Sequence, residues 1–88
     1  MYKLSNKYSF KNFKEVGLLV PEDDSLPLIE VESKELKLIE LLVDGAIMKN
    51  LVNFLKSEGY KMDDEDMAEL DSFIKRLLDK KVIYFVSD

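Results

Sequence analysis

The most charged stretch of the chain is the acidic run KMDDEDMAELD at residues 61–71. Carboxylates are the ligands that Ca²⁺ prefers, but an EF-hand loop also needs a glycine at its sixth position and a glutamate at its twelfth. Counted from Asp63, the sixth position is Ala68. The run matches instead the first turn of a helix, where acids meet the positive end of the dipole. We therefore expect no metal site here.

Catalytic chemistry has few candidates in this sequence. The 88 residues include no cysteine and no histidine. This removes disulfides, Cys/His zinc sites and the Ser–His and Cys–His nucleophilic pairs. Carboxylates, lysines and tyrosines remain, but no motif brings a nucleophile beside a base. We expect no catalytic residue and no cofactor, and hence a binding module rather than an enzyme.

Charge also limits the partners. The net charge is −5, whereas binding to phosphates requires clustered lysine and arginine. Four tyrosines and five phenylalanines could stack on bases, but stacking platforms lie in basic grooves, so we assign them to the core, with Tyr60 and Tyr84 partly exposed. No apolar run reaches the roughly 20 residues of a membrane span, and MYKLSNKYSF lacks a signal-peptide core. We expect a cytoplasmic protein without a nucleic-acid or membrane partner.

Residue periodicity predicts three strands in the first part of the chain. Polar and apolar residues alternate over residues 7–14, and residues 16–20 form a short apolar run that Pro21 ends. In residues 28–32, Ile29 and Val31 share one face. The segment PEDDSLP between the second and third strands predicts a hairpin turn.

Three helices are predicted to follow. The first begins at the N-cap Ser33 and ends at Asp44-Gly45, and the second ends at Gly59. Asp63 or Asp64 caps the third. In each helix the apolar positions recur at helical spacing. They are Leu36, Ile39, Leu42 and Val43 in the first helix, Ile47, Leu51, Phe54 and Leu55 in the second, and Met67, Leu70, Ile74, Leu77 and Leu78 in the third. Phe73 lies at the margin of the third apolar stripe. Residues 82–86 form a tail strand.

This order predicts a single α+β domain over residues 1–88, with a three-stranded antiparallel sheet followed by three helices, in a winged-helix-like arrangement. Such folds commonly place the third helix in the major groove of DNA. Here that helix begins with carboxylates, which would repel phosphate. A winged-helix regulator that binds DNA or a protein stays as the alternative function.

The third predicted strand carries the most specific functional signal. Natural proteins usually block sheet edges with lysine, proline or bulges, yet residues 28–32 contain neither lysine nor proline. Either the N-terminal strand or the tail covers this edge, or the edge is open. An open edge could pair with a second copy of the chain or accept an extended peptide as a further strand. Glu30 and Glu32 could then select lysine or arginine on that peptide.

The segments LLVPEDDSLPLIEVESKELKLIELLVDG, LVNFLKSEGY and FIKRLLDKKVIYF follow one another in an order and spacing that resembles the PqqD family. The family is named for pyrroloquinoline quinone biosynthesis and includes the recognition elements of ribosomally made, modified peptides. The resemblance covers roughly residues 8 to 86.

The resemblance implies a peptide chaperone without catalysis of its own. Such domains bind the leader segment of a precursor peptide between the third strand and the third helix, and present the core segment to a modifying enzyme, often a radical S-adenosylmethionine enzyme. Within the site, Phe73 and Leu28 are the residues that we most expect to touch the peptide. Carried over by position, the groove would be lined by Leu28, Ile29, Glu30, Val31, Leu70, Phe73, Ile74 and Leu77. The chain would be a monomer or an edge-paired dimer.

Overall fold

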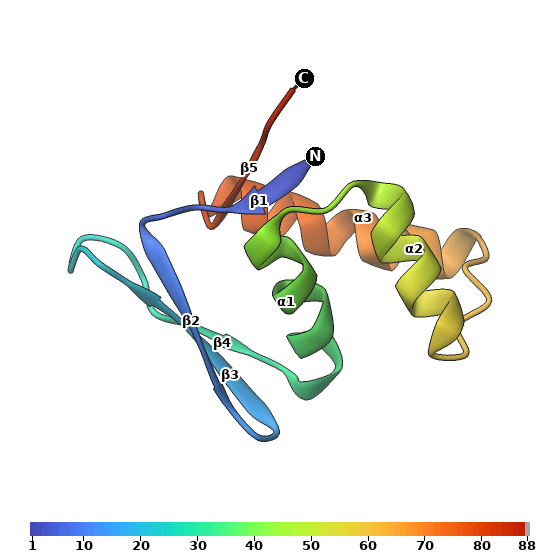
Figure 1. Cartoon of the computed structure of the whole chain (residues 1–88), viewed down its shortest axis with the longest axis horizontal. Coiled ribbons are helices and arrows are strands. Elements are labelled where there is room, and N and C mark those ends of the chain that lie inside the picture. Colours follow the sequence, from blue (N-terminus) through green and yellow to red (C-terminus); the bar gives the residue numbers. More distant parts are fainter. Residues whose placement is uncertain (88) are drawn as a thin grey trace.

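Two antiparallel sheets and three α-helices make up the fold of residues 1–87, the part of the chain that this computed structural model describes (Figure 1). The elements follow in the order β1 (Tyr2–Leu4), β2 (Tyr8–Phe13), β3 (Val16–Pro21), β4 (Ile29–Val31), the 3₁₀ turn η1 (Ser33–Glu35), α1 (Leu36–Asp44), α2 (Met48–Ser57), α3 (Asp64–Asp79) and β5 (Ile83–Phe85). The predicted class, a three-stranded antiparallel sheet followed by three helices, is confirmed. The likeness to winged-helix proteins stays a prediction.

The larger sheet has the strand order β2-β3-β4. Its centre, β3, pairs with β2 from Tyr8 opposite Pro21 to Phe13 opposite Val16, and with β4 from Gly17 opposite Val31 to Leu19 opposite Ile29. The start of α1 packs on β3 at Gly17. A Cβ added there would collide with Leu36 and would lie 2.8 Å from the Phe10 ring, so the close approach of helix and sheet requires glycine.

The segment between β3 and β4 forms the predicted turn. Asp23 Oδ1 accepts a hydrogen bond from the Ser25 backbone N–H at 2.9 Å, and the Asp23 carbonyl accepts one from the Leu26 N–H at 3.0 Å. The Ser25 N–H favours the charged carboxylate and holds the pKa of Asp23 below its ordinary value. The Tyr8 hydroxyl donates to the Pro27 carbonyl at 3.1 Å and so ties β2 to the end of the turn. This turn therefore fixes where β4 begins.

The smaller sheet joins the two ends of the chain. β1 pairs with β5, from Tyr2 opposite Phe85 to Leu4 opposite Ile83, and the Tyr2 N–H donates to the Ala46 carbonyl at 2.7 Å. The strand β1 was not predicted, whereas the tail strand was. Figure 1 shows the two strands side by side, away from β4. Within residues 1–87, neither the predicted N-terminal strand, which is β2, nor the tail strand β5 pairs with β4.

The helix ends match the predictions except at the start of the first helix. Asp63 caps α3, with its Oδ1 accepting from the Asp66 N–H at 3.0 Å, and Gly45 ends α1 with a φ of 97°. Ser33 makes no side-chain cap, so that prediction was wrong. The reason is the intervening η1 turn, in which the Glu35 N–H is satisfied by the Glu32 carbonyl at 2.9 Å.

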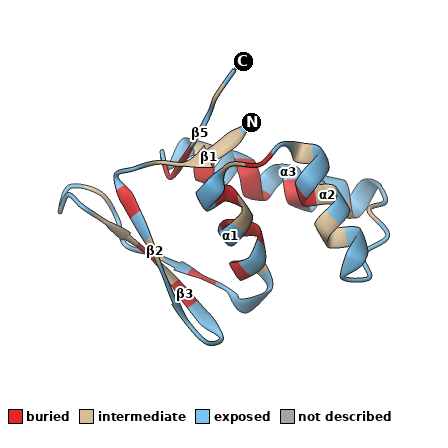
Figure 2. Ribbon diagram, viewed as in Figure 1, coloured by how far each residue is buried: buried red, intermediate tan, exposed pale blue. Residues whose placement is uncertain are grey.

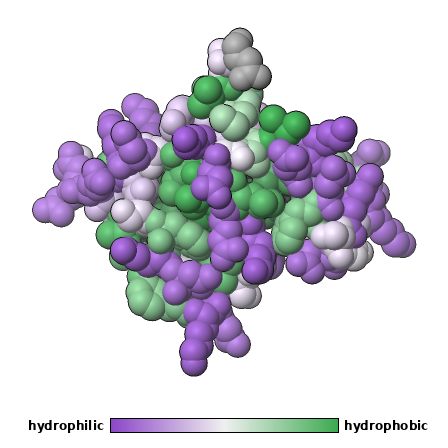
Figure 3. Space-filling view, in the orientation of Figure 1, coloured by the Kyte–Doolittle hydropathy of each residue, from purple (hydrophilic) through white to green (hydrophobic). Residues whose placement is uncertain are grey.

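One core connects the sheet to all three helices. The most deeply buried side chains come from β3, α1, α2, α3 and the segment before β5: Leu19, Ile39, Leu42, Leu51, Ile74 and Val82. Figure 2 shows the buried positions on the inner faces of α1 and α3, and hydrophobic side chains fill the middle of this side of the molecule (Figure 3). Within residues 1–87, no helix has the length and apolar character needed to cross a bilayer.

Candidate functional site

The sheet edges differ in how they are protected. Within residues 1–87, β4 pairs only with β3, so its outer side has no strand partner. The other outer strand, β2, carries Lys11 and is flanked by Lys7 and Lys14. Lysines of this kind discourage edge-to-edge pairing, and β4 has none. Leu28, directly before β4, has 60% of its surface exposed. Of the two edges of this sheet, β4 is therefore the one that carries no lysine.

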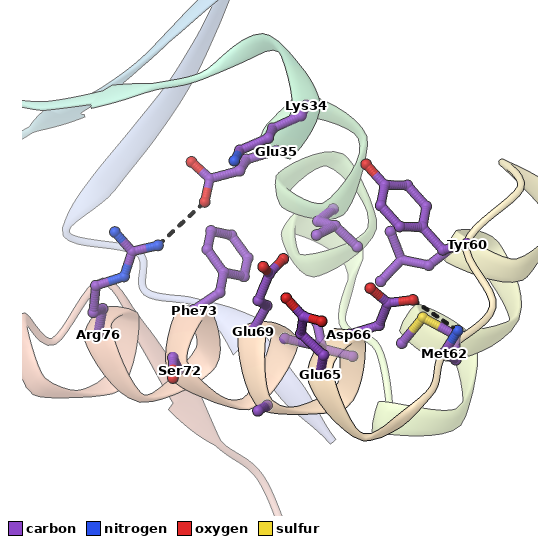
Figure 4. Close-up of a pocket in the computed structure, with 14 residues that line it drawn as sticks. Lys34, Glu35, Tyr60, Met62, Glu65, Asp66, Glu69, Ser72, Phe73 and Arg76 are labelled. Atoms are coloured by element: carbon purple, nitrogen blue, oxygen red, sulfur yellow. Dashed lines mark hydrogen bonds and ion pairs between the residues drawn. The ribbon is translucent and has the colours of Figure 1, made fainter.

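A pocket of about 470 Å³ is lined by η1, α1, the end of α2 with the segment that follows it, and α3 (Figure 4). Along the chain, the lining residue nearest to β4 is Lys34, three residues after Val31, and no β4 residue lines the pocket. Its inner lining is apolar, and its rim carries charged and polar side chains. The apolar lining comprises Leu38, Leu55, Tyr60, Met62, Ala68, Leu70 and Phe73, and the polar lining comprises Lys34, Glu35, Glu65, Asp66, Glu69, Ser72 and Arg76.

The helix α3 supplies one wall through its regular spacing. Glu65, Glu69, Ser72 and Arg76 recur at intervals of four, three and four residues and therefore lie along one face. In Figure 4 the carboxylates of Glu65 and Glu69 lie on the side of α3 that faces Tyr60 and η1. The neighbouring apolar stripe forms the core. A polar stripe beside an apolar one thus gives the pocket its rim and its floor.

Ion pairing closes one end of the pocket. Arg76 Nη2 lies 3.3 Å from Glu35 Oε2, and the guanidinium lies 5.8 Å from the centre of the Phe73 ring. Lys34 Nζ lies 3.7 Å from Glu32 Oε2, outside the pocket. The two basic side chains of the rim therefore already have acidic partners.

The acidic side chains differ in their partners. Asp66 Oδ2 accepts a hydrogen bond from the Met62 N–H at 3.0 Å, and Glu35 is paired with Arg76. Among residues 1–87, Glu65 and Glu69 have no hydrogen bond or ion pair through their side chains. They lie one turn apart, where two like charges repel each other mildly. The rim thus has two carboxylates to offer to a cation.

The eight residues carried over from the PqqD resemblance divide into three groups. Leu28 and Glu30 are exposed and Ile29 is half-buried along β4, outside the pocket lining. Val31, Ile74 and Leu77 are core residues with 3%, 2% and 6% of their surface exposed. Leu70 and Phe73 are also buried, yet both line the pocket.

The aromatic side chains differ in how far they are exposed. Phe73, which was expected at the margin of the α3 apolar stripe, has 7% of its surface exposed and lines the pocket. The ring packs into the angle between α3 and the start of α1, where η1 brings Glu35 above it. The partial exposure of Tyr60 and Tyr84 is confirmed, at 43% and 45%. The assignment of the other aromatic side chains to the core was wrong for Phe13 and Phe85, which have 62% and 59% of their surface exposed.

Sequence reasoning missed the polar rim. The acidic run that contains Glu65 and Glu69 was explained as the first turn of a helix, and Glu35 and Arg76 were given no role in a site. The helical spacing of Glu65, Glu69 and Arg76 was a usable signal, but the pairing of Arg76 with a residue 41 positions away was not visible in the sequence.

Comparisons with known proteins add no assignment. No protein-family model, no curated protein and no solved structure matches the chain. The PqqD resemblance therefore stays a prediction, and the functional argument depends on the β4 edge and on the pocket between η1 and α3.

Proposed function

We propose that the chain is a PqqD-like recognition element that works in the cytoplasm without catalysis of its own. It binds the leader segment of a ribosomally made precursor peptide as an additional strand on β4. It then presents the core segment to a modifying enzyme of the radical S-adenosylmethionine class. The observation that carries the proposal is the outer edge of β4, which has no strand partner within residues 1–87 and no lysine.

Strand addition at β4 would use two kinds of contact. Main-chain hydrogen bonds fix the register of the peptide, and alternate side chains find pockets that select the sequence. Leu28 offers an exposed apolar side chain at the start of the strand, and Leu70 and Phe73 offer an apolar floor in the pocket. Burying one leucine-sized side chain of the leader is worth about 1.5 to 3 kcal/mol.

The gain from such binding is local concentration rather than extreme affinity. A disordered leader loses conformational freedom when it orders on the strand, which costs about 2 to 5 kcal/mol of the interaction energy. Holding it beside the enzyme then makes modification of the core segment effectively intramolecular. Tethering of this kind raises overall avidity by about 10² to 10⁴.

The DNA-binding alternative is weakened by the surface of α3. Its first turn carries Asp64, Glu65 and Asp66, and the basic residue of its last turn, Arg76, is paired with Glu35. A helix with this charge order would bring carboxylates to the phosphates. A dimer through β4 would have only three strand residues per copy to pair.

A titration of the ¹⁵N-labelled chain tests the proposal. The proposal predicts that a short precursor peptide is encoded near the gene; the ligand is a synthetic leader segment of such a peptide, and duplex DNA at the same concentration is the comparison. We expect amide shifts at residues 28–32 and along α3, with none produced by DNA. Shifts that spare residues 28–32, or binding of DNA without binding of the leader, would contradict the proposal. Light scattering of the free chain identifies an edge-paired dimer.

A further inference from the structure

The pocket between η1 and α3 has a floor and a rim of different chemistry. Leu38, Leu70 and Phe73 lie beneath, all with less than a tenth of their surface exposed. Glu65 and Glu69 lie along the α3 side of the opening (Figure 4). Such a site suits a side chain that is apolar along its length and charged at its tip.

The charges of the rim determine whether the charged end of the bound side chain is positive or negative. Four carboxylates and two cations line the pocket. Glu35 pairs with Arg76 and Asp66 holds the Met62 N–H, which leaves Glu65 and Glu69 as the two carboxylates with no side-chain partner among residues 1–87. Because they lie four residues apart on one helix face, a cation between them would also relieve their mutual repulsion.

The molecule already contains one example of this arrangement. The Arg76 side chain reaches from α3 so that its guanidinium lies over the Phe73 ring at 5.8 Å and meets the Glu35 carboxylate at 3.3 Å. Long basic side chains commonly bury their aliphatic stems on apolar surface while their charged ends reach polar groups. A second basic side chain could use the other end of the same floor in the same way.

We infer that this pocket receives a lysine or arginine side chain of the bound peptide, an inference that rests on the proposed function. The aliphatic stem lies on Leu70 and Phe73, and the cation lies between Glu65 and Glu69. The class of leader that the chain accepts is therefore one that carries a basic residue outside the segment that pairs with β4. The charge at the pocket selects which leader binds. The main-chain hydrogen bonds to β4 hold the leader as an added strand, whatever its sequence.

Side-chain analogues test the pocket without the leader. The probes are n-butylguanidinium, which carries the charge of arginine, and neutral n-butylurea of nearly the same shape. We expect n-butylguanidinium to shift the amides of residues 65–73 and the ring protons of Phe73, and to bind about three to ten times more tightly than n-butylurea. Equal binding of the two probes, or no shift at these residues, would overturn the inference.

A pair of double variants identifies the carboxylates. Glu65→Gln with Glu69→Gln should remove the preference for the charged probe. Asp64→Asn with Asp71→Asn changes the net charge by the same amount at α3 positions outside the pocket lining, and should keep the preference. Loss of the preference in both variants would show a general charge effect and would overturn the inference.

The leader itself separates this inference from the proposed function. With every lysine and arginine of the leader replaced by glutamine, we expect the shifts at residues 28–32 to persist at saturation while affinity falls about three- to tenfold. Unchanged affinity would overturn the basic-residue pocket and leave strand addition standing. Absence of shifts at residues 28–32 with the natural leader would overturn strand addition, whatever the analogues do at the pocket.

Discussion

The Arg76 guanidinium and the Glu35 carboxylate meet at 3.3 Å, Nη2 to Oε2, and join α3 to the turn that follows β4. Their side chains differ in exposure, at 64% for Arg76 and 18% for Glu35. Both residues line the pocket, so the contact spans it from α3 to η1 at that end. Because the pair connects elements distant in the sequence, it contributes to tertiary structure as well as to the site.

Replacing Arg76 should weaken the fold slightly. For Arg76→Gln we expect the free energy of unfolding to fall by about 0.5 to 1 kcal/mol, since the pair is partly exposed and the contact with the Phe73 ring is lost as well. The matched control is Lys75→Gln, which breaks a more exposed pair with Asp71 and should cost less than about 0.5 kcal/mol. Urea unfolding measures both, and equal losses would contradict a special role for the Glu35 pair.

A lysine at the β4 edge should block the peptide. Leu28→Lys places a gatekeeping charge beside the open strand, and we expect leader affinity to fall about tenfold while the free energy of unfolding changes by less than about 0.5 kcal/mol. Phe13→Lys is the control, because Phe13 is as exposed as Leu28, at 62% against 60%, but lies at the far end of β2. If both variants weakened leader binding equally, the cause would be the added charge rather than its position beside β4.

Two neighbouring substitutions on α3 should separate core from site. Ile74→Val removes a methylene group from a core side chain and should cost about 0.5 to 1.5 kcal/mol in unfolding while leaving leader affinity within about twofold. Phe73→Leu should cost a similar amount and also weaken leader binding several-fold, because Phe73 lines the pocket. Isothermal titration together with urea unfolding distinguishes the two. Identical effects on binding would mean that Phe73 acts only through the core.

The Tyr8 hydroxyl gives a prediction with a pH dependence. Tyr8→Phe loses the hydrogen bond to Pro27 and should cost about 0.5 to 1.5 kcal/mol at neutral pH. Burial raises the pKa of Tyr8, so the folded state keeps the proton longer than the unfolded state does. The stabilisation is therefore complete below the unfolded pKa of about 10 and is lost as pH rises through the folded value. Urea unfolding of the natural protein and of Tyr8→Phe from pH 7 to 11 should show that the difference between their free energies of unfolding becomes smaller as the pH rises. A difference that grows with pH would contradict this.

Much of the fold was predictable because its signals are local. The alternation in β2, the apolar run of β3 and the cap at Asp63 depend on neighbouring residues, and each element formed close to where the sequence placed it. The strand β1 was not predictable in this way. It has three residues, and its partner β5 lies about 80 positions along the chain.

The site was less predictable than the fold for a related reason. The apolar stripe of α3 identified Leu70 as an inward position, but whether an inward residue meets the core or a pocket depends on which element packs above it. The η1 turn brings Glu35 over Phe73, and the sequence at Ser33 indicated a helix cap there instead. The floor of the pocket could thus be predicted in part, whereas its rim required the tertiary packing.

The most direct test of strand addition at β4 is the detection of cross-strand contacts in the complex. With the chain labelled in ¹³C and ¹⁵N and the leader unlabelled, filtered nuclear Overhauser spectra report which backbone protons lie across from the peptide. The proposal predicts regular contacts from consecutive leader residues to residues 29–31. Contacts to residues 8–13 of β2 or 83–85 of β5, with none to β4, would contradict it.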